Sequence, residues 1–290
     1  MTTPRFARGA GALLLLPLLG IVPAGAAAGA EIEVFHADSL AGPMRELRNA
    51  FVAQHPGVAV NLTSGVSKQL AERIVKGERC DVFAPSSPAV IDDDLMGKPV
   101  AGGAKTAAQW YVVFSANEMA IVTAKGNPLG IRAAADLARP DVRFVRINGE
   151  KDLATGRTLE FLKRATQKEG KPALAQAIAD RAPSEPGKAV TVPDAVAAVR
   201  QGRADAAVVY LSAAVAAGGD VEIVRFADDV NLSEAIRNAA TVPGTAVAVD
   251  DAIAFVAFLL SPQARRILAD TGQPPVTPAL RKGAVPAAIR

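Results

Sequence analysis

The chain has 290 residues, of which 50% are hydrophobic and 21% charged, and its formal net charge is +3. Without Arg5 and Arg8 near the N-terminus, the basic and acidic side chains almost balance, at a net charge of about +1. No run of Lys and Arg with interleaved aromatic residues occurs, so the composition gives no electrostatic basis for binding nucleic acid. The single cysteine, Cys80, excludes an internal disulfide, and its apolar neighbours predict a packed thiol.

The N-terminal 30 residues have the pattern of a cleaved secretory signal. Arg5 and Arg8 precede an apolar stretch over residues 12–22, and Ala28-Gly29-Ala30 supplies the small residues of a cleavage site. The apolar stretch is too short to span a bilayer. We therefore expect residues 1–30 to be a signal peptide, the mature chain to begin near Glu31, and the protein to be periplasmic.

Short β-rich segments alternate with amphipathic helical segments in the first part of the mature chain. We expect strands at residues 32–35, 58–62 and 81–84, and helices at residues 40–55 and 68–76. This alternation predicts an α/β fold with a largely parallel sheet.

A second α/β system follows. We expect strands at residues 119–123, 143–147 and 206–210, a turn at 126–128, and helices at 157–166, 173–181, 193–200, 252–260 and 262–270. A surface connection over residues 168–188 surrounds one of these helices, and a proline-rich tail ends the chain. Two lobes are predicted, one from residues 31–116 with 236–290 and one from residues 117–235. Extended crossings near residues 114–120 and 236–242 join them around a cleft.

Two serines follow the first two predicted strands, each where a helix begins. Ser39 and Ser67 can cap their helices by accepting a bond from a backbone N–H. Alternatively, their hydroxyls and the free N–H groups at the helix start can hold an anion. Both interpretations remain open for each serine.

The second predicted lobe offers similar positions. Thr155 lies between a strand and a helix, and Val192 precedes Pro193 at the start of another helix. Tyr210 ends a strand, where its hydroxyl either reaches the cleft or is solvated at an interface.

Several segments, in order along the chain, resemble the periplasmic molybdate/tungstate-binding family of type II solute-binding proteins. They are VFHADSL (34–40), SGVSKQL (64–70), CDVFAPS (80–86), KGNP (125–128) with DLARP (136–140), AAVVY (206–210) and LLSPQARRILADTGQPP (259–275). The resemblance covers nearly all of the mature chain. It implies a two-lobe type II binding-protein fold with the ligand cleft between the lobes, and a monomer that delivers molybdate or tungstate to the membrane permease of an ABC importer.

The resemblance also implies a ligand set. Ser39 and Ser67 would donate hydroxyl and amide hydrogens, Thr155 and Val192 backbone amides, and Tyr210 its hydroxyl. Asp152 is a possible further contact, as in tungstate binders that bring carboxylates to the metal, although a solvated acid or a helix cap is the ordinary role. No cofactor and no free metal cation are expected besides the ligand itself.

Two other interpretations remain. A binding protein of the same fold can take sulfate, thiosulfate or another small anion. A periplasmic hydrolase would need a nucleophile and base, and Ser39 with His36 is the pair on offer. No Gly-x-Ser-x-Gly elbow, HExxH motif or phosphate-binding glycine-rich loop is present. We therefore expect no enzymatic activity and no catalytic residues.

Overall fold

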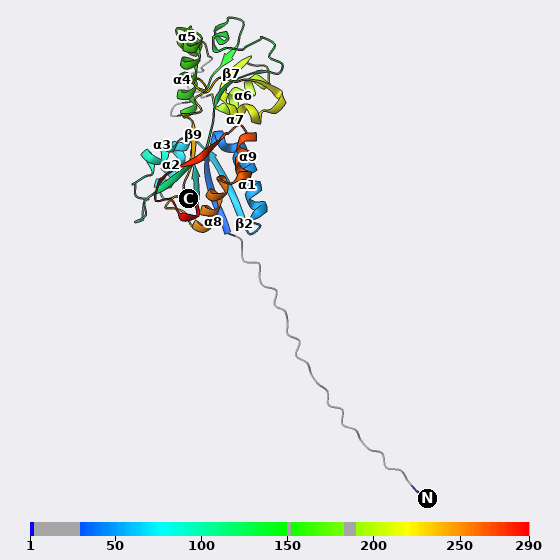
Figure 1. Cartoon of the computed structure of the whole chain (residues 1–290), viewed down its shortest axis with the longest axis vertical. Coiled ribbons are helices and arrows are strands. Elements are labelled where there is room, and N and C mark those ends of the chain that lie inside the picture. Colours follow the sequence, from blue (N-terminus) through cyan, green and yellow to red (C-terminus); the bar gives the residue numbers. More distant parts are fainter. Residues whose placement is uncertain (3–29, 150–151, 183–189, 290) are drawn as a thin grey trace.

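A computed structural model describes residues 1–2, 30–149, 152–182 and 190–289. The predicted signal peptide falls almost wholly outside these residues. Figure 1 shows two lobes, one containing both the blue beginning and the red end of the folded chain and the other its green and yellow middle. The predicted α/β two-lobe architecture is confirmed.

The first lobe is built partly on a parallel sheet of strand order β2-β1-β3. It comprises β1 (Ala30–Ala37), β2 (Val58–Gly65) and β3 (Val82–Ala84). Helices α1 (Ala41–Gln54), α2 (Ser67–Val75) and α3 (Pro88–Asp94) follow these strands. The register aligns His36 with both Ser64 and Ala84, so the carboxyl ends of all three strands lie at one level.

A second sheet completes this lobe. Strand β4 (Trp110–Ala116) lies between β9 (Arg237–Ala240) and β10 (Pro275–Gly283), antiparallel to both. Helices α8 (Val249–Leu259) and α9 (Pro262–Asp270) pack near α1, where the ring centroids of Phe51 and Phe255 are 5.0 Å apart. The lobe is thus assembled from the two ends of the chain.

The buried carboxylate of Asp81 joins distant segments of the first lobe. Its Oδ2 accepts the N–H of Glu33 in β1 at 2.8 Å. Its Oδ1 accepts the N–H groups of Val247 and Ala248, just before α8, at 2.7 and 2.9 Å. Arg79 pairs with the same carboxylate at 3.0 Å. The neighbouring Cys80 is fully buried, as predicted, and burial raises the pKa of its thiol.

The second lobe has a four-stranded mixed sheet of order β6-β7-β5-β8. Its strands are β5 (Met119–Ala124), β6 (Phe144–Val145), β7 (Ala206–Tyr210) and β8 (Val221–Val224). Its helices are α4 (Leu153–Lys168), α5 (Leu174–Arg181), α6 (Val192–Arg200) and α7 (Leu211–Ala216). One hydrophobic cluster, which includes the fully buried Phe161 and whose members run in sequence from Met119 to Ile236, forms the core of this lobe.

Polar side chains connect the lobes where the chain crosses between them. Asn117 donates its backbone N–H to Ile236 O at 3.1 Å and its Nδ2 to Ser212 Oγ at 2.9 Å. Ser212 Oγ in turn donates to Ser39 O at 3.1 Å. Asn117 and Ile236 lie in the two predicted crossings, while the lobe boundaries at 116/117 and 235/236 stay predictions.

Three expectations about elements were wrong. The sheets are not largely parallel, because β5 runs antiparallel to β7 and β8 and the β4 sheet is wholly antiparallel. The proline-rich tail contains the strand β10. Helix α4 begins at Leu153 rather than at residue 157, because Asp152 caps its N-terminus.

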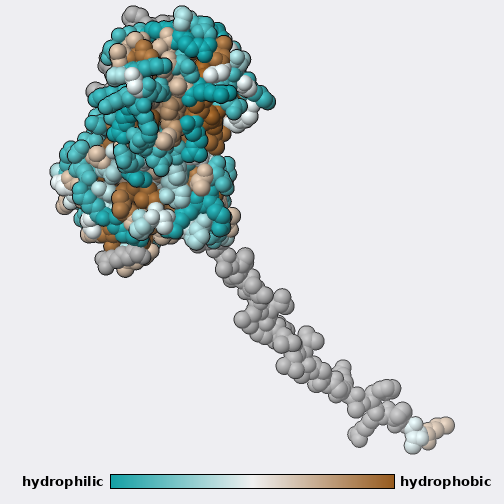
Figure 2. Space-filling model, turned by 45° about the horizontal axis from the view of Figure 1, so that its top comes forward, coloured by the Kyte–Doolittle hydropathy of each residue, from teal (hydrophilic) through white to brown (hydrophobic). Residues whose placement is uncertain are grey.

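The surface visible in Figure 2 is mainly hydrophilic over both lobes, with hydrophobic residues in local patches. In the part of the chain that the structure describes, no single helix has the length and apolar composition to cross a membrane. Helices α8 and α9 have that length and composition only when taken together, and a bend of 63° separates them.

Candidate functional site

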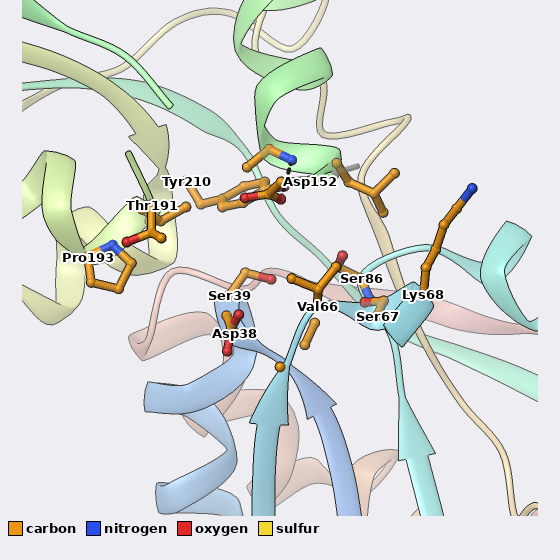
Figure 3. A pocket seen from close by; sticks show the side chains of 15 residues that line it. Asp38, Ser39, Val66, Ser67, Lys68, Ser86, Asp152, Thr191, Pro193 and Tyr210 are labelled. Atoms are coloured by element: carbon orange, nitrogen blue, oxygen red, sulfur yellow. Dashed lines mark hydrogen bonds between the residues drawn. The ribbon is translucent and has the colours of Figure 1, made fainter. Parts of the chain in front are cut away.

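A cavity of ≈ 90 Å³ lies between the two lobes, at the carboxyl ends of β1, β2, β3 and β7. It is lined by residues 37–39, 65–68 and 86 from the first lobe, and by residues 152–154, 191–193 and 210 from the second. Figure 3 shows Tyr210, Asp152 and Thr191 facing the serine-bearing loops of the first lobe. Four of the five predicted ligand residues, Ser39, Ser67, Val192 and Tyr210, come together here.

The two serines do not act as helix caps, so that interpretation was wrong. Ser39 lies in a short 3-10 turn (Asp38–Leu40) after β1, and Ser67 is the first residue of α2. No side chain caps α1 or α2. Ser67 Oγ accepts the N–H of Ser86 at 3.3 Å, whereas Ser39 Oγ has no hydrogen-bond partner among the described residues. Both hydroxyl protons are therefore available to the cavity.

Tyr210 closes β7 and is 3% exposed, so the solvated-hydroxyl alternative was wrong. Its hydroxyl accepts a bond from Arg157 Nη1 at 2.9 Å. Burial raises the pKa of Tyr210, although the charge of Arg157 opposes the shift. The phenol is therefore neutral at physiological pH and keeps its proton for donation.

Val192 begins α6, whose N-cap Thr191 accepts the N–H of Asp194 at 3.3 Å. The N–H groups of the first helical turn have no partner within the helix. The cavity thus faces one more helix N-terminus, where backbone donors and the helix dipole favour negative charge.

Thr155 is not brought to the cavity. Its N–H donates to Asp152 O at 3.1 Å and its hydroxyl to Gly149 O at 2.8 Å, while Leu153 and Ala154 line the cavity instead. The early start of α4 explains the difference, because Thr155 lies within its first turn. Asp152 has the predicted cap role, accepting Ala154 N–H at 2.9 Å, and it also lines the cavity.

Charged groups lie at the edge of the cavity. Asp38 accepts a hydrogen bond from Ser64 Oγ, and Lys68 extends from the start of α2. Within residues 30–149, 152–182 and 190–289, no cluster of His, Cys, Asp or Glu has the arrangement of a metal-ion site.

The hydrolase pair is not assembled. His36 is buried, bonds through Nδ1 to Ala37 O at 2.9 Å, and does not line the cavity. Burial lowers the pKa of this imidazole. Its contacts make it a packing residue of β1 and not a base for Ser39.

Arg157 is a residue of this region to which the sequence analysis gave no role. Besides Tyr210, it contacts Ser86 O through Nη2 at 2.7 Å, so its guanidinium touches both lobes. Both acceptors lie far from Arg157 in the sequence, so no local pattern in the chain indicates this role.

Comparisons with known proteins show the family of the chain. Residues 32–273 match the family model of the bacterial extracellular solute-binding protein. The molybdate-binding protein ModA of Mycobacterium tuberculosis (strain ATCC 25618 / H37Rv) is 31% identical over 251 residues, covering 86% of this chain and 87% of the relative.

Solved structures show the same fold. The Azotobacter vinelandii periplasmic molybdate-binding protein aligns with a TM-score of 0.63 at 19% identity, covering 85% of this chain and 99% of that one. The sulfate-binding protein SubI from Mycobacterium tuberculosis H37Rv aligns with a TM-score of 0.64 at 21% identity, covering 86% and 88%.

Proposed function

Because the chain belongs to the bacterial extracellular solute-binding protein family, a group of ABC-importer components outside the cytoplasm, we propose that its ligand is a small tetrahedral oxyanion, molybdate or tungstate first. The relatives are transport proteins rather than enzymes. The proposed partners are this anion and the membrane permease of the importer, and the protein is proposed to act as a monomer.

One observation carries the proposal: neutral hydrogen-bond donors from both lobes line the cavity of ≈ 90 Å³, beside the charged side chains of Asp38, Lys68 and Asp152. Sites for drug-sized molecules occupy about 300–1,000 Å³, so this cavity suits a ligand of only a few heavy atoms. Hydroxyls of Ser39, Ser67 and Tyr210, with the amides at the start of α2 and α6, make it complementary to oxygen atoms that carry negative charge.

These donors explain why binding and closure are coupled. Each hydrogen bond to a charged group contributes about 1.5–3 kcal/mol, and only the closed arrangement brings both sets of donors to the same oxygens. A ligand that binds the closed form more tightly than the open form shifts the population toward closure. The importer can then distinguish loaded from empty protein by shape.

The test is isothermal titration of the purified mature chain with molybdate, tungstate, sulfate, thiosulfate and phosphate. We expect one site per chain, with molybdate and tungstate, which have longer bonds to oxygen than sulfate has, bound more tightly than sulfate. Tyr210→Phe should weaken every oxyanion that binds without unfolding the free protein, although its melting temperature should fall because Arg157 Nη1 loses its acceptor. Absence of binding to all five anions would refute the proposal.

Sulfate is the second candidate, supported by the likeness to the sulfate-binding protein SubI. The same titration separates the two, since tighter binding of sulfate than of molybdate reverses the assignment.

The proposed secretion and monomeric state have their own tests. N-terminal sequencing of the exported protein should give a start near Glu31, and light scattering should give the mass of one mature chain. An uncut N-terminus or a dimer mass would contradict these assignments.

A further inference from the structure

One guanidinium connects the two halves of the cleft. Arg157 lies in the second lobe on α4, and its Nη1 donates to Tyr210 Oη in the same lobe at 2.9 Å. Its Nη2 donates to Ser86 O in the first lobe at 2.7 Å. The guanidinium carbon lies 5.7 Å from the centroid of the Tyr210 ring, so the fork is also held against that ring.

These bonds fix the direction of the Tyr210 hydroxyl. Arginine has only donors, so Arg157 must use an oxygen lone pair of Tyr210, and the single hydroxyl proton is left to point elsewhere. Tyr210 lines the cavity and Arg157 does not. The proton that Arg157 cannot accept is therefore available on the cavity side.

The same argument applies across the cleft at Ser67. The N–H of Ser86 donates to Ser67 Oγ at 3.3 Å, which leaves the hydroxyl proton of Ser67 for the cavity. The carbonyl of Ser86 is held by the other arm of Arg157. In Figure 3, Ser67 and Ser86 lie beside each other, opposite Tyr210.

We propose that Arg157 is a positioning residue that aims the hydroxyl protons of Tyr210 and Ser67 at the bound anion and latches the two lobes together. The aiming half rests on the proposed function, whereas the latch does not. A planar fork with two donors in fixed directions is required, because a lysine ammonium on a flexible stem cannot hold both acceptors in the same geometry.

The test compares Arg157→Met, Arg157→Lys and the control Arg164→Met. Arg164 lies on the same helix, but its partners Glu160 and Glu234 are both in the second lobe, away from the cavity. We expect Arg157→Met to weaken binding of molybdate, or of whichever oxyanion the wild type binds best, by about 10- to 100-fold. Arg157→Lys should recover only part of the loss, and Arg164→Met should bind as the wild type does.

A double-mutant cycle separates positioning from general damage. If Arg157 acts through Tyr210, Arg157→Met should weaken binding less in a Tyr210→Phe background than in the wild type. An equal loss in both backgrounds would overturn the aiming half of the proposal, as would wild-type affinity in Arg157→Met. Melting temperatures of all variants identify any loss of binding that comes from unfolding. If Arg157→Met unfolds, the binding of Arg157→Lys decides whether the proposal stands.

The latch is tested without any ligand. Small-angle X-ray scattering of the ligand-free protein should give a larger radius of gyration for Arg157→Met than for the wild type and Arg164→Met. Equal radii would overturn the latch. This measurement stays decisive even if the wild type binds no oxyanion, so failure of the proposed function and failure of the latch give different results.

Discussion

The two serines of the cavity should respond differently to removal of their hydroxyls. Ser39 Oγ has no hydrogen-bond partner in the described part of the chain, whereas Ser67 Oγ accepts the N–H of the buried residue Ser86. In the proposed site, Ser39→Ala therefore removes only a contact to the ligand. Ser67→Ala removes such a contact and also leaves a buried N–H without its acceptor.

The magnitudes follow from the two kinds of bond. A hydrogen bond to a charged ligand contributes about 1.5–3 kcal/mol, which corresponds to an increase in Kd of about 10- to 150-fold for either variant. A buried donor left without a partner costs about 1–3 kcal/mol of stability. Ser67→Ala should therefore lower the free energy of unfolding of the ligand-free protein by this amount, and Ser39→Ala should leave it unchanged.

The assay combines oxyanion titration with urea denaturation of the ligand-free protein. Ser87→Ala is the matched control, because Ser87 adjoins Ser86 but does not line the cavity, and its side chain makes no capping hydrogen bond although it occupies the N-cap position of α3. Equal stability of the two variants, or a loss confined to Ser39→Ala, would refute the assignment of the Ser67–Ser86 bond. Unchanged affinity in both would refute the ligand roles.

Three further predictions concern stability. Burial lowers the pKa of His36 in the folded protein. The stability that the neutral imidazole contributes is therefore present above its ordinary pKa of 6.5 and is lost as the pH falls below that value. The stability of His36→Gln should fall less between pH 7 and 5 than that of the wild type. Gly283→Ala places a methyl group 2.1 Å from Gln109 O at a φ of +82°, and should lower the urea midpoint strongly, whereas Gly57→Ala, with nothing within 4 Å, should not. Asp81→Asn loses charge-assisted bonds and should cost about 2–4 kcal/mol of stability without changing Kd, which denaturation and titration together measure.

Hydrophobic periodicity, and the rule that ligand sites lie at the carboxyl ends of parallel strands, were sufficient to predict much of the fold and part of the site. Helix α9 and strand β7 have the predicted bounds, because each has a continuous pattern and a clear boundary residue. The convergence of Ser39 and Ser67 followed from parallel strands ending at one level. These features depend on local sequence and on one general rule of α/β sheets.

The missed features depend on distant partners. The prolines at 275 and 278 disguised β10, which lies at the edge of its sheet, where prolines are tolerated. Arg157 is separated by 53 and 71 positions from its two acceptors, so no local pattern reveals its role. Thr155 was misplaced because Asp152 starts α4 earlier than the apolar spacing indicates.

The position of β4 between β9 and β10 has a consequence for the order of folding. A chain that emerges from its N-terminus exposes β4 long before residues 237–283, which supply both neighbouring strands, have been made. The second lobe, formed by an uninterrupted stretch, has all its strands earlier. Such long-range pairing slows folding, so the first lobe completes its folding last. A truncation before residue 275 would leave one edge of β4 unpaired, where chaperones or other chains can bind and aggregation can begin.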